Sequence, residues 1–453
     1  MTGIRVITAP LAFVDDAWIA DAAIAIHGDL IAWAGPASEL PERFAGASVE
    51  AWGDRAVVPG GVNGHGHTFQ ALVRGFGDDL RFADWMGGLV HPTAAGLGAD
   101  GIRIGAEFDF VEMLRMGITT AVEYFYLHDR GNENSRVILD AARSVGMRTV
   151  LARCMFDADP GPVRYRESLA EYEANYRELA TELADDPLLH VHPAPHSVLG
   201  TSAEMLRLGN ALAREFDVPL HTHVADSPGE VGVSRSRWDL TPVGRLADVG
   251  VLDEYLLAVH AVNVDEHDLA LLASSGATVV HNPSANAFLG GGVMPLVRMR
   301  ELGIPVALGT DAGGANSRQS LFEEMRMSAL LAKATAQDAS VVTATDVLRL
   351  GTSAGGAALR MPVGRIAAGF AADLVSLDLE APSLKPRRTA TQNVVYSMQP
   401  EAIDRVLVGG RTVVDDGEVV TVDVPRVLAE VDVLTASWTP LTGTHPAPAA
   451  SVD

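Results

Sequence analysis

The sequence of 453 residues contains a single cysteine, Cys154, so it can form no intrachain disulfide bond and no cysteine-based metal cluster. Cys154 lies in an apolar, strand-like run over residues 149–156, which is typical of a packed, unreactive thiol. No apolar run approaches the roughly 20 residues that a membrane-spanning helix needs. The N-terminus lacks a basic start followed by a long apolar segment, so we expect no signal peptide. These absences predict a soluble, cytoplasmic protein that does not interact with membranes.

Positive charge is also scarce, since 34 Lys and Arg residues stand against 58 Asp and Glu residues, for a formal net charge of −24. A surface of this sign repels phosphate backbones, so we expect no nucleic-acid partner, and simple solubility is the ordinary consequence of such a charge. Hydrophobic residues make up 48% and charged residues 20% of the chain, which is an ordinary globular balance and argues against disorder. The length suits a large barrel plus a second unit.

Both ends of the chain carry short apolar runs separated by Gly and Asp, such as residues 22–29 and 30–35 near the N-terminus and 364–375 and 405–414 near the C-terminus. Runs of this kind are typical of antiparallel strands joined by tight turns. They predict a small β-sandwich domain assembled from both termini, over residues 1–58 and 361–440. The Pro- and Ala-rich residues 441–453 are expected to form a loose tail.

Between residues 59 and 360, short apolar strands alternate with segments that are long enough for helices. The strand candidates, besides a first strand that ends at His65, are Thr119–Glu123, Thr149–Arg153, His190–Ala194, Val218–Val224, Leu256–Ala261, Ala277–His281 and Val306–Asp311. Eight strands that alternate with helices predict an α/β fold, a parallel (β/α)8 TIM-like barrel over residues 59–360 that would carry the catalytic site.

Two histidines, His65 and His67, follow the first strand of this barrel. Residues i and i+2 of an extended segment point to the same side, so both imidazoles can reach one ion. A neutral imidazole nitrogen is a good ligand for a borderline divalent metal such as zinc. Two nearby histidines also occur by chance, so the motif needs support from elsewhere in the chain.

Further ligand-type side chains follow the ends of later strands, where the catalytic groups of (β/α)8 barrels gather. They are His196 after the fourth strand, His221 and His223 at the fifth, His260 at the sixth, His281 at the seventh and Asp311 at the eighth. A single histidine at a strand end is more often a satisfied polar residue, and Asp311 alone could cap a helix or shape a turn. Three imidazoles and one carboxylate with an open position, however, match a catalytic site for a hydrolytic metal.

A series of motifs extends this pattern over nearly the whole chain. They are Pro59-Gly60 through His65-Gly66-His67-Thr68, Leu72-Val73-Arg74-Gly75 with Asp84-Trp85, Gly117-Ile118-Thr119-Thr120, His221-Thr222-His223-Val224-Ala225-Asp226, His281-Asn282-Pro283-Ser284-Ala285-Asn286, Gly303 through Asp311, Leu321-Phe322-Glu323-Glu324, Gly364-Arg365-Ile366 and Ala371-Ala372-Asp373-Leu374-Val375. Together they resemble the amidohydrolase superfamily, and in particular its methylthioadenosine/S-adenosylhomocysteine deaminase and triazine hydrolase group. The resemblance implies a metal-dependent hydrolase that acts on C–N bonds.

The resemblance assigns one divalent metal ion to four ligands, which are His65, His67, His223 and Asp311. Zinc is the expected ion, with iron and manganese as alternatives that accept the same ligands. The second histidine of the pair at 221 and 223 fits the group's pattern, in which an acid follows the ligand by three residues. His221 is then expected to face away from the metal and to be structural.

The resemblance also implies catalytic roles for three residues near the metal. Asp311 is expected to accept a proton from the attacking water, His260 to orient that water or polarise the reacting centre, and Asp226 to shuttle the proton to the departing nitrogen. Without that proton, amide ion would have to leave, and it is an extremely poor leaving group. The expected substrate-binding residues are His196, Arg153, His281 and Trp85.

Two positions depart from the nucleoside deaminases of the group. Asp226 stands where they carry glutamate, and the loss of one methylene shortens its reach by about 1.5 Å, which can matter greatly for proton transfer. Glu230 is an alternative shuttle, and Asp226 could also be a plain turn residue. Alignment on Arg74, Trp85 and Pro92 places Ala94 where the group has a glutamate that resembles a ribose-hydroxyl ligand. A methylthioadenosine or S-adenosylhomocysteine substrate therefore becomes less favoured.

The combined features predict hydrolytic deamination of an amino-substituted nitrogen heterocycle, namely a purine, pterin, pyrimidine or triazine. Alternatives at the same site are dechlorination or N-dealkylation of a triazine-like ring, and deimination of an acyclic formimino compound. The last alternative rests on residues 67–70, which resemble a segment of formiminoglutamate deiminases. A third hypothesis is a catalytically inactive scaffold that binds partners, but the complete set of metal ligands argues against it. The expected partners are a small-molecule substrate and further copies of the chain, as a dimer or tetramer.

Overall fold

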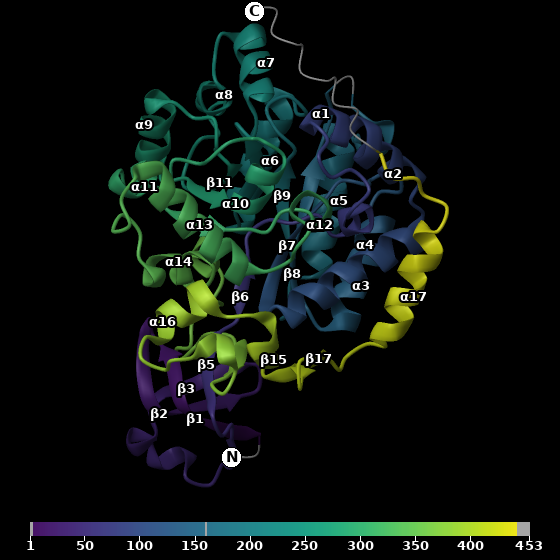
Figure 1. Cartoon of the computed structure of the whole chain (residues 1–453). Coiled ribbons are helices and arrows are strands. Elements are labelled where there is room, and N and C mark those ends of the chain that lie inside the picture. Colours follow the sequence, from purple (N-terminus) through teal and green to yellow (C-terminus); the bar gives the residue numbers. More distant parts are fainter. Residues whose placement is uncertain (1–2, 159–160, 442–453) are drawn as a thin grey trace, which may run out of the picture.

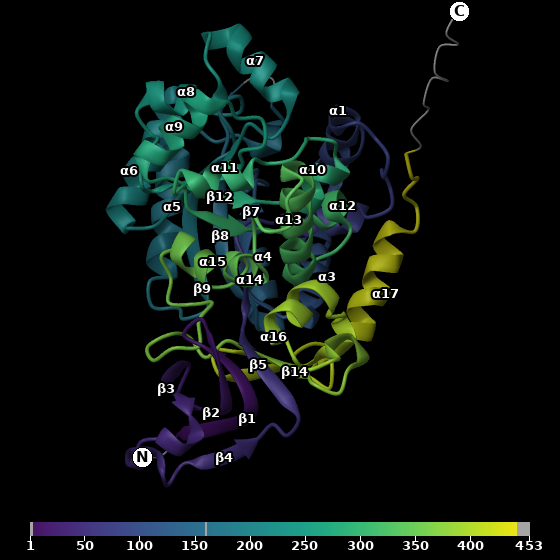
Figure 2. The same ribbon diagram turned by 60° about the vertical axis from the view of Figure 1, so that its left-hand side comes forward.

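The computed structural model describes residues 3–158 and 161–441 in two regions, a sheet near the N-terminus and a larger body of parallel strands covered by helices (Figures 1 and 2). The expected tail lies outside the described residues, apart from Leu441. Within the described ranges, every helix is too short or too polar to cross a membrane.

The first region is one nine-stranded sheet that both ends of the chain build. Its strands are β1 (Ile4–Val14), β2 (Ala17–His27), β3 (Leu30–Pro36), β4 (Ser48–Ala51), β5 (Arg55–Pro59), β14 (Leu374–Asp378), β15 (Ile403–Val408), β16 (Arg411–Asp415) and β17 (Glu418–Val419). They run in the order β17-β16-β15-β14-β5-β1-β2-β3, with β4 paired to β1. The prediction that both termini share one β unit is confirmed, and the N-terminal and C-terminal halves meet where β5 pairs antiparallel with β14.

Local chemistry explains the first hairpin of this sheet. Asp15 and Asp16 join β1 to β2, and both have positive φ, at 49° and 65°. Two-residue hairpin loops favour such a pair of left-handed residues, and Asp tolerates that conformation better than most side chains. The apolar side chains of the sheet form their own core, which includes Ile7, Ile24 and Leu374.

The second region contains all eight strands that the sequence predicted between residues 59 and 360. They are β6 (Gly61–Asn63), β7 (Ile118–Phe125), β8 (Arg148–Met155) and β9 (Leu189–Pro195) in one sheet, and β10 (Leu220–Val224), β11 (Leu256–His260), β12 (Thr278–His281) and β13 (Val306–Leu308) in another. Each sheet is parallel and its strands follow in chain order. Every residue of β7 and β8 is buried, as expected for parallel strands covered on both faces.

Helices cover these strands on the outside (Figures 1 and 2). In chain order, the helices up to residue 392 are α1 (Phe82–Trp85), α2 (His91–Gly96), α3 (Ala99–Arg115), α4 (Glu133–Val145), α5 (Leu169–Glu182), α6 (Ala203–Phe216), α7 (Pro228–Trp238), α8 (Pro242–Val249), α9 (Glu266–Ser275), α10 (Pro283–Phe288), α11 (Leu296–Glu301), α12 (Gly313–Asn316), α13 (Leu321–Ala336), α14 (Ala344–Leu350), α15 (Ser353–Ala358) and α16 (Ala390–Gln392). Of these, α16 lies next to the terminal sheet, where Thr391 accepts a hydrogen bond from Trp18 (Figures 1 and 2). The short helices α10 and α12 directly follow β12 and β13, so they lie at the carboxyl ends of the strands.

A further helix, α17 (Val424–Thr435), falls in the range for which the sequence predicted β structure. It packs along α3 instead of adding a strand to the terminal sheet (Figures 1 and 2). Two ion pairs hold it there, Arg426 to Glu107 at 2.9 Å and Arg103 to Glu430 at 3.0 Å. The C-terminal segment therefore returns to the larger region.

Hydrogen bonds connect the edges of the two parallel sheets near the carboxyl ends of their strands. Gly64 N, just after β6, donates to Leu308 O of β13 at 2.9 Å, and Asp311 N donates to His65 O at 3.0 Å. At the other edge an isolated parallel bridge joins Ser197, after β9, to His223 of β10. The segments that carry the predicted ligands are thereby brought to one place.

Candidate metal centre and active site

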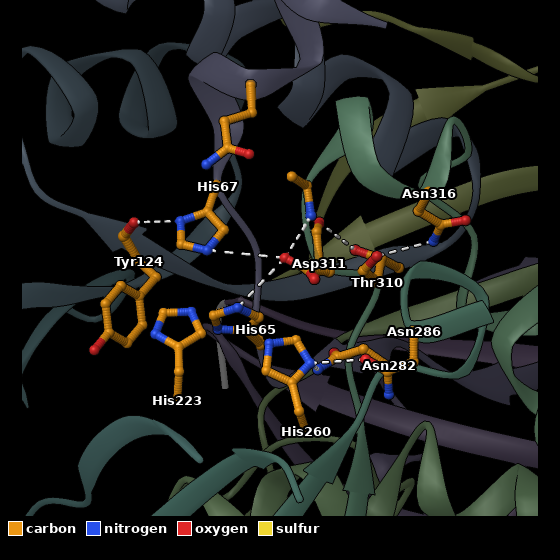
Figure 3. Close-up of polar contacts among 12 residues, drawn as sticks. His65, His67, Tyr124, His223, His260, Asn282, Asn286, Thr310, Asp311 and Asn316 are labelled. Atoms are coloured by element: carbon orange, nitrogen blue, oxygen red, sulfur yellow. Dashed lines mark hydrogen bonds and ion pairs between the residues drawn. The ribbon is translucent and has the colours of Figure 1, made fainter. Parts of the chain in front are cut away.

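Five side chains from four strand ends converge in the larger region, because His65 and His67 both follow β6 (Figure 3). His65 Nε2 lies 3.5 Å and His67 Nε2 3.8 Å from the Oδ1 atom of Asp311. Potential ligand atoms of His65, His67 and His223 lie within 4.8 Å of one another, and so do those of His65, His260 and Asp311. The structure therefore brings together all four of the predicted ligands, with His260 beside them.

The backbone at this place adopts conformations that few residues tolerate. His260 and Asp311 have positive φ, at 77° and 60°. Left-handed backbone at residues other than glycine is uncommon and is concentrated at functional sites, where the surrounding structure enforces it. Gly309 leaves the room that His65 needs, because a Cβ atom on it would lie 3.0 Å from His65 N and 2.4 Å from Asn282 Oδ1.

Backbone carbonyl groups orient two of the imidazoles. His67 Nδ1 lies 2.7 Å from Tyr124 O, and His223 Nδ1 lies 2.7 Å from His196 O (Figure 3 for the first). A carbonyl can only accept, so Nδ1 carries the proton in both rings and Nε2 keeps a free lone pair. Metal-binding histidines in proteins are held in this way by an acceptor on the nitrogen that does not bind the metal.

His65 is the ring that most clearly lacks a partner. It is fully buried, and neither ring nitrogen has a hydrogen-bond partner among the described residues. A buried polar group without a partner costs about 1–3 kcal/mol, so such atoms call for an explanation. A bound cation supplies one, because it would take up the lone pair on Nε2.

The protonation states of the cluster fit the same explanation. Burial, assisted by the charge of His65, lowers the pKa of His67 to about 3, and burial also lowers the pKa of His65 and of His223 below the usual range. Burial alone would raise the pKa of Asp311, but the close approach of His65, at 3.5 Å, and of the other nearby imidazoles outweighs it and holds that pKa below its ordinary value. Neutral imidazoles and an ionised carboxylate are the forms that bind a divalent metal.

The loop that carries Asp311 is held from behind by amide side chains. Asn63 accepts a hydrogen bond from Thr310 N at 2.9 Å and donates to Thr310 Oγ1 at 2.8 Å. Thr310 also bonds Gln319, and Asn316 donates to Thr310 O at 2.9 Å (Figure 3 for the last). These contacts fix the position of the carboxylate relative to the strand that precedes His65.

His260 is oriented by side chains rather than by the backbone. Its Nδ1 atom lies 2.9 Å from Asn286 Oδ1, within α10, and 3.2 Å from Asn282 Nδ2, between β12 and α10 (Figure 3). The shorter contact favours a proton on Nδ1 that is donated to Asn286, which leaves Nε2 without a proton. His260 can therefore accept a hydrogen bond from a water molecule near Asp311.

The cluster opens into a cavity of about 980 Å³. Its lining includes His223, His260 and Asp311 together with Gln70, Phe82, Trp85, Met86, His196 and Asp226. A second cavity of about 410 Å³ shares His196, His223 and Asp226 and extends to Phe156, Tyr165 and Glu230. Asp226 and His196 thus lie where the two cavities meet, next to the metal cluster.

Of the four predicted substrate-binding residues, two line a cavity at the cluster and two do not. Trp85 and His196 line the larger cavity. Arg153 lines neither of the two cavities, because its buried guanidinium bonds both oxygens of Glu167, at 2.6 and 2.8 Å, and Asn132 at 3.0 Å. His281 is buried as well, lies outside both linings, and has its pKa lowered to about 3 by burial. The assignment of these last two residues to direct substrate contact is not supported.

Sequence reasoning missed the groups that orient the rings. The carbonyl groups that hold His67 and His223 leave no trace in residue type, because every residue has one. Asn286 was part of a recognised motif, and its place soon after a strand end was a usable signal for contact with a neighbouring strand end. His221 lies outside both groups of potential metal ligands among the described residues, with its Nε2 2.9 Å from His192 Nδ1, and its structural role stays a prediction.

Known proteins are similar to this chain in both sequence and fold. The model of the amidohydrolase family matches residues 56–413. A 5-methylthioadenosine/S-adenosylhomocysteine deaminase of Syntrophobacter fumaroxidans is 33% identical over 418 residues, which cover 90% of this chain and 92% of the relative. The similarity therefore spans nearly the full length of both proteins.

Two solved structures share the arrangement of the chain. An adenosine deaminase from Xanthomonas campestris with bound zinc has a TM-score of 0.89 at 29% identity, over 95% of this chain and 98% of that one. An atrazine chlorohydrolase from Arthrobacter aurescens, in complex with zinc and atraton, has a TM-score of 0.88 at 22% identity, over 95% and 99% of the two chains. The second likeness concerns the fold alone.

Proposed function

The chain belongs to the amidohydrolase family, and from this premise we propose that it is a metal-dependent enzyme that removes an amino group from a nitrogen heterocycle by hydrolysis. One observation carries the proposal, the convergence of His65, His67, His223 and Asp311, whose potential ligand atoms fall in two groups that share His65. These four residues would hold one divalent ion, for which zinc is the candidate, as in the Xanthomonas campestris structure. When bound, the ion would act as a Lewis acid and make a nucleophilic water available at neutral pH.

The residues of the chain then divide the proton transfers between them. Asp311, an ionised carboxylate at the cluster, accepts a proton from the attacking water. His260 accepts a hydrogen bond from that water through Nε2 and so fixes the direction of attack. Asp226 lies on the wall of the same cavity and delivers a proton to the nitrogen that leaves. Ammonia, rather than the far more basic amide ion, is then the leaving group.

The cavity suits a flat aromatic ring without a sugar. Phe82, Trp85 and Met86 supply apolar walls, and two buried polar atoms on the lining have no partner among the described residues, Trp85 Nε1 as a donor and Gln70 Oε1 as an acceptor. Such atoms can pair with the edge of a heterocycle. Ala94, at the position of the ribose-binding glutamate, is buried and offers no carboxylate.

A substrate screen tests this proposal directly. Purified protein loaded with zinc is incubated with adenine, guanine, pterin, cytosine and an aminotriazine, and with adenosine and methylthioadenosine, while ammonia release is measured. We expect turnover of at least one free aminated ring, and a higher kcat/KM for it than for either nucleoside. Faster turnover of the nucleosides would overturn the substrate assignment, and no ammonia from any compound would overturn the activity.

Deamination can be distinguished from reactions with other leaving groups by its dependence on a proton donor. Chloride leaves as an anion, whereas an amine must be protonated, so Asp226→Asn should impair deamination far more than dechlorination. Equal and small losses on an amino and a chloro substrate would remove the shuttle role from Asp226. A chlorotriazine, an N-alkylaminotriazine and a formimino compound, added to the screen, would reveal dechlorination, N-dealkylation or deimination as release of chloride, alkylamine or ammonia.

We also propose that the eight parallel strands form one closed (β/α)8 barrel over residues 59–360, and that the terminal strands form a β-sandwich from residues 1–58 and 361–440 without helix α17. The hydrogen bonds from Gly64 to Leu308 and the bridge between Ser197 and His223 support closure at both edges. A cytoplasmic location and assembly into a homodimer or homotetramer remain proposals from the sequence. Sedimentation of the purified protein would decide the assembly.

A further inference from the structure

A second carboxyl group, that of Glu230, lies against Asp226 at the start of α7. Glu230 Oε2 accepts a hydrogen bond from Asp226 N at 3.0 Å, which brings the two carboxyl groups near enough to influence each other. Glu230 is only 8% exposed and lines the second cavity, while Asp226 lines both cavities. In the described part of the chain, no N–H or O–H group donates to Asp226 Oδ1 or to Glu230 Oε1.

A structural explanation for Glu230 has to be weighed first. Ser227 caps α7 by accepting a hydrogen bond from Glu230 N at 3.2 Å, and an acid at this third helical position commonly folds back onto the backbone as a capping box. Glu171 in α5 shows the ordinary form of this motif. Its carboxylate is exposed and accepts from Ser168 N at 2.9 Å and from Ser168 Oγ at 2.7 Å.

Glu230 differs from that ordinary cap in burial and in its partner. Hydrogen bonds from Ser168 lower the pKa of Glu171, as expected for an ionised cap. Burial raises the pKa of Glu230 well above its usual range, and the charge of Asp226 raises it further. Two carboxyl groups that meet in a buried place retain one proton between them, because a pair of adjacent negative charges is strongly disfavoured. An exposed cap needs no such proton.

We propose that Asp226 and Glu230 act together as one proton-transferring pair, with Asp226 facing the reacting ring and Glu230 behind it. The inference rests on the proposed deamination and adds a residue to it. The pair also accounts for the aspartate at position 226, because a buried acid beside it directs the shorter side chain and supplies its proton. Glu230 is the positioning and reloading residue, and Asp226 is the one that contacts the substrate.

The proton balance of the step is simple. A C–O bond forms between water and the ring carbon, the C–N bond breaks, and ammonia leaves with one proton more than the amino group held. That proton passes from Asp226 to the nitrogen, Glu230 reloads Asp226, and the proton given up by the attacking water restores the pair. No oxidant or further reactant is needed.

Other titratable or charged groups line the smaller cavity beside Asp226 and Glu230. They are His91, Tyr165, His196 and Arg237, together with His223 of the metal cluster. Burial lowers the pKa of His91 and of His196, to about 4 for His196, so both are neutral near pH 7. Burial raises the pKa of Tyr165 further above its ordinary value, so it is neutral as well. Asp226 and Glu230 are thus the acids of this cavity.

The test compares Glu230→Gln with Glu171→Gln, which changes a cap of the same kind far from the site. The amide oxygen of Gln can still accept from Asp226 N, but Gln cannot release a proton. We expect Glu230→Gln to lower kcat on the amino substrate by roughly 100-fold, the lower end of what a positioned acid contributes, with KM little changed. The alkaline limb of its pH profile should also move to lower pH. Glu171→Gln should behave as the wild type.

A second variant and a spectroscopic readout make the outcome decisive. Asp226→Glu in the Glu230→Gln background restores the longer acid, so it should recover most of the lost kcat. The infrared C=O band of a protonated carboxyl that disappears on alkaline titration should be weaker in Glu230→Gln than in the wild type, with or without metal. Equal kcat and equal bands in Glu230→Gln and Glu171→Gln would overturn the pair.

Failure of the proposed function would look different. If the wild type releases no ammonia from any aminated ring, the deamination proposal fails, while the infrared comparison still decides whether Glu230 holds a proton beside Asp226. If the wild type deaminates a ring and Glu230→Gln does so equally well, the function stands and the pair is wrong. Metal content and the unfolding midpoint of each variant show that a loss of kcat is not a loss of folding.

Discussion

Replacement of Asn286 by Ala should impair turnover while leaving metal binding intact. Asn286 is 5% exposed, and its Oδ1 atom accepts the Nδ1 proton of His260 at 2.9 Å. Removal of that acceptor frees the imidazole to rotate and to exchange its tautomer, so Nε2 no longer faces the water beside Asp311 reliably. His260 is outside the proposed ligand set, so the metal should stay.

The magnitude follows from the geometry of one lost contact. Loss of a residue that orients a functional histidine costs about 10-fold to 100-fold in activity, which corresponds to about 1.4–2.7 kcal/mol of transition-state stabilisation. Asn286→Asp keeps an oxygen in place of Oδ1 and should lose less than Asn286→Ala. Asn282→Ala should also lose less, because Asn282 is the more distant neighbour of the same nitrogen, at 3.2 Å.

The assay is steady-state ammonia release, with bound metal measured by plasma mass spectrometry on the same samples. We expect kcat/KM of Asn286→Ala to fall by at least tenfold at unchanged metal content. Loss of metal from Asn286→Ala would show that His260 is itself a ligand. Unchanged kcat/KM would refute the role of His260 as a group oriented by Asn286.

Three further substitutions test other parts of the structure. Gly309→Ala places a Cβ atom 3.0 Å from His65 N and should weaken zinc binding by roughly tenfold or more in a chelator competition, whereas unchanged affinity would mean that this space is not needed. Burial raises the pKa of Glu324 to about 7, so the folded state keeps a proton that the unfolded chain loses above about pH 4.5, and stability should fall as pH rises through this window by about 3 kcal/mol. Glu324→Gln should flatten that slope in urea unfolding of the metal-free protein, and an unchanged slope would contradict the shift. Asp373→Ala removes the partner of buried Arg148, 3.1 Å away, and should destabilise the fold by about 3–5 kcal/mol, unless the guanidinium reaches water.

The strands and the site could be predicted from the sequence where the alternation of apolar runs and their order in the chain determine the structure. Parallel strands place their carboxyl ends together, so His65 after the first strand, His223 on the fifth and Asp311 after the last could be assigned to one site without coordinates. Strand geometry alone did not separate His221 from His223, because residues i and i+2 of a strand point to the same side, and only the family resemblance selected His223 as the ligand. The nine-stranded order of the terminal sheet was not available from periodicity, because pairing partners far apart in sequence leave no local pattern.

Contacts between side chains were the weaker part of the prediction. Arg153, at the end of an apolar run, was predicted to bind substrate, but in the structure it forms a buried ion pair with Glu167. The spacing of these two residues in the sequence gives no sign of that pair. The contact between Asp226 and Glu230 depends on how the first turn of α7 meets the strand before it. The helix α17 could have been predicted, because Val424, Val427, Val431 and Leu434 recur at helical spacing. The segment was instead included in the predicted β domain.

Metal content with activity measured on the same preparation tests the central claim most directly. Purified wild-type protein should hold about one equivalent of divalent metal per chain, lose ammonia release when a chelator removes it, and regain it with zinc. His65→Ala and His223→Ala should each lose both the metal and the turnover. Protein without stoichiometric metal that still deaminates, or that no divalent ion activates, would contradict the assignment of this cluster as a catalytic metal centre.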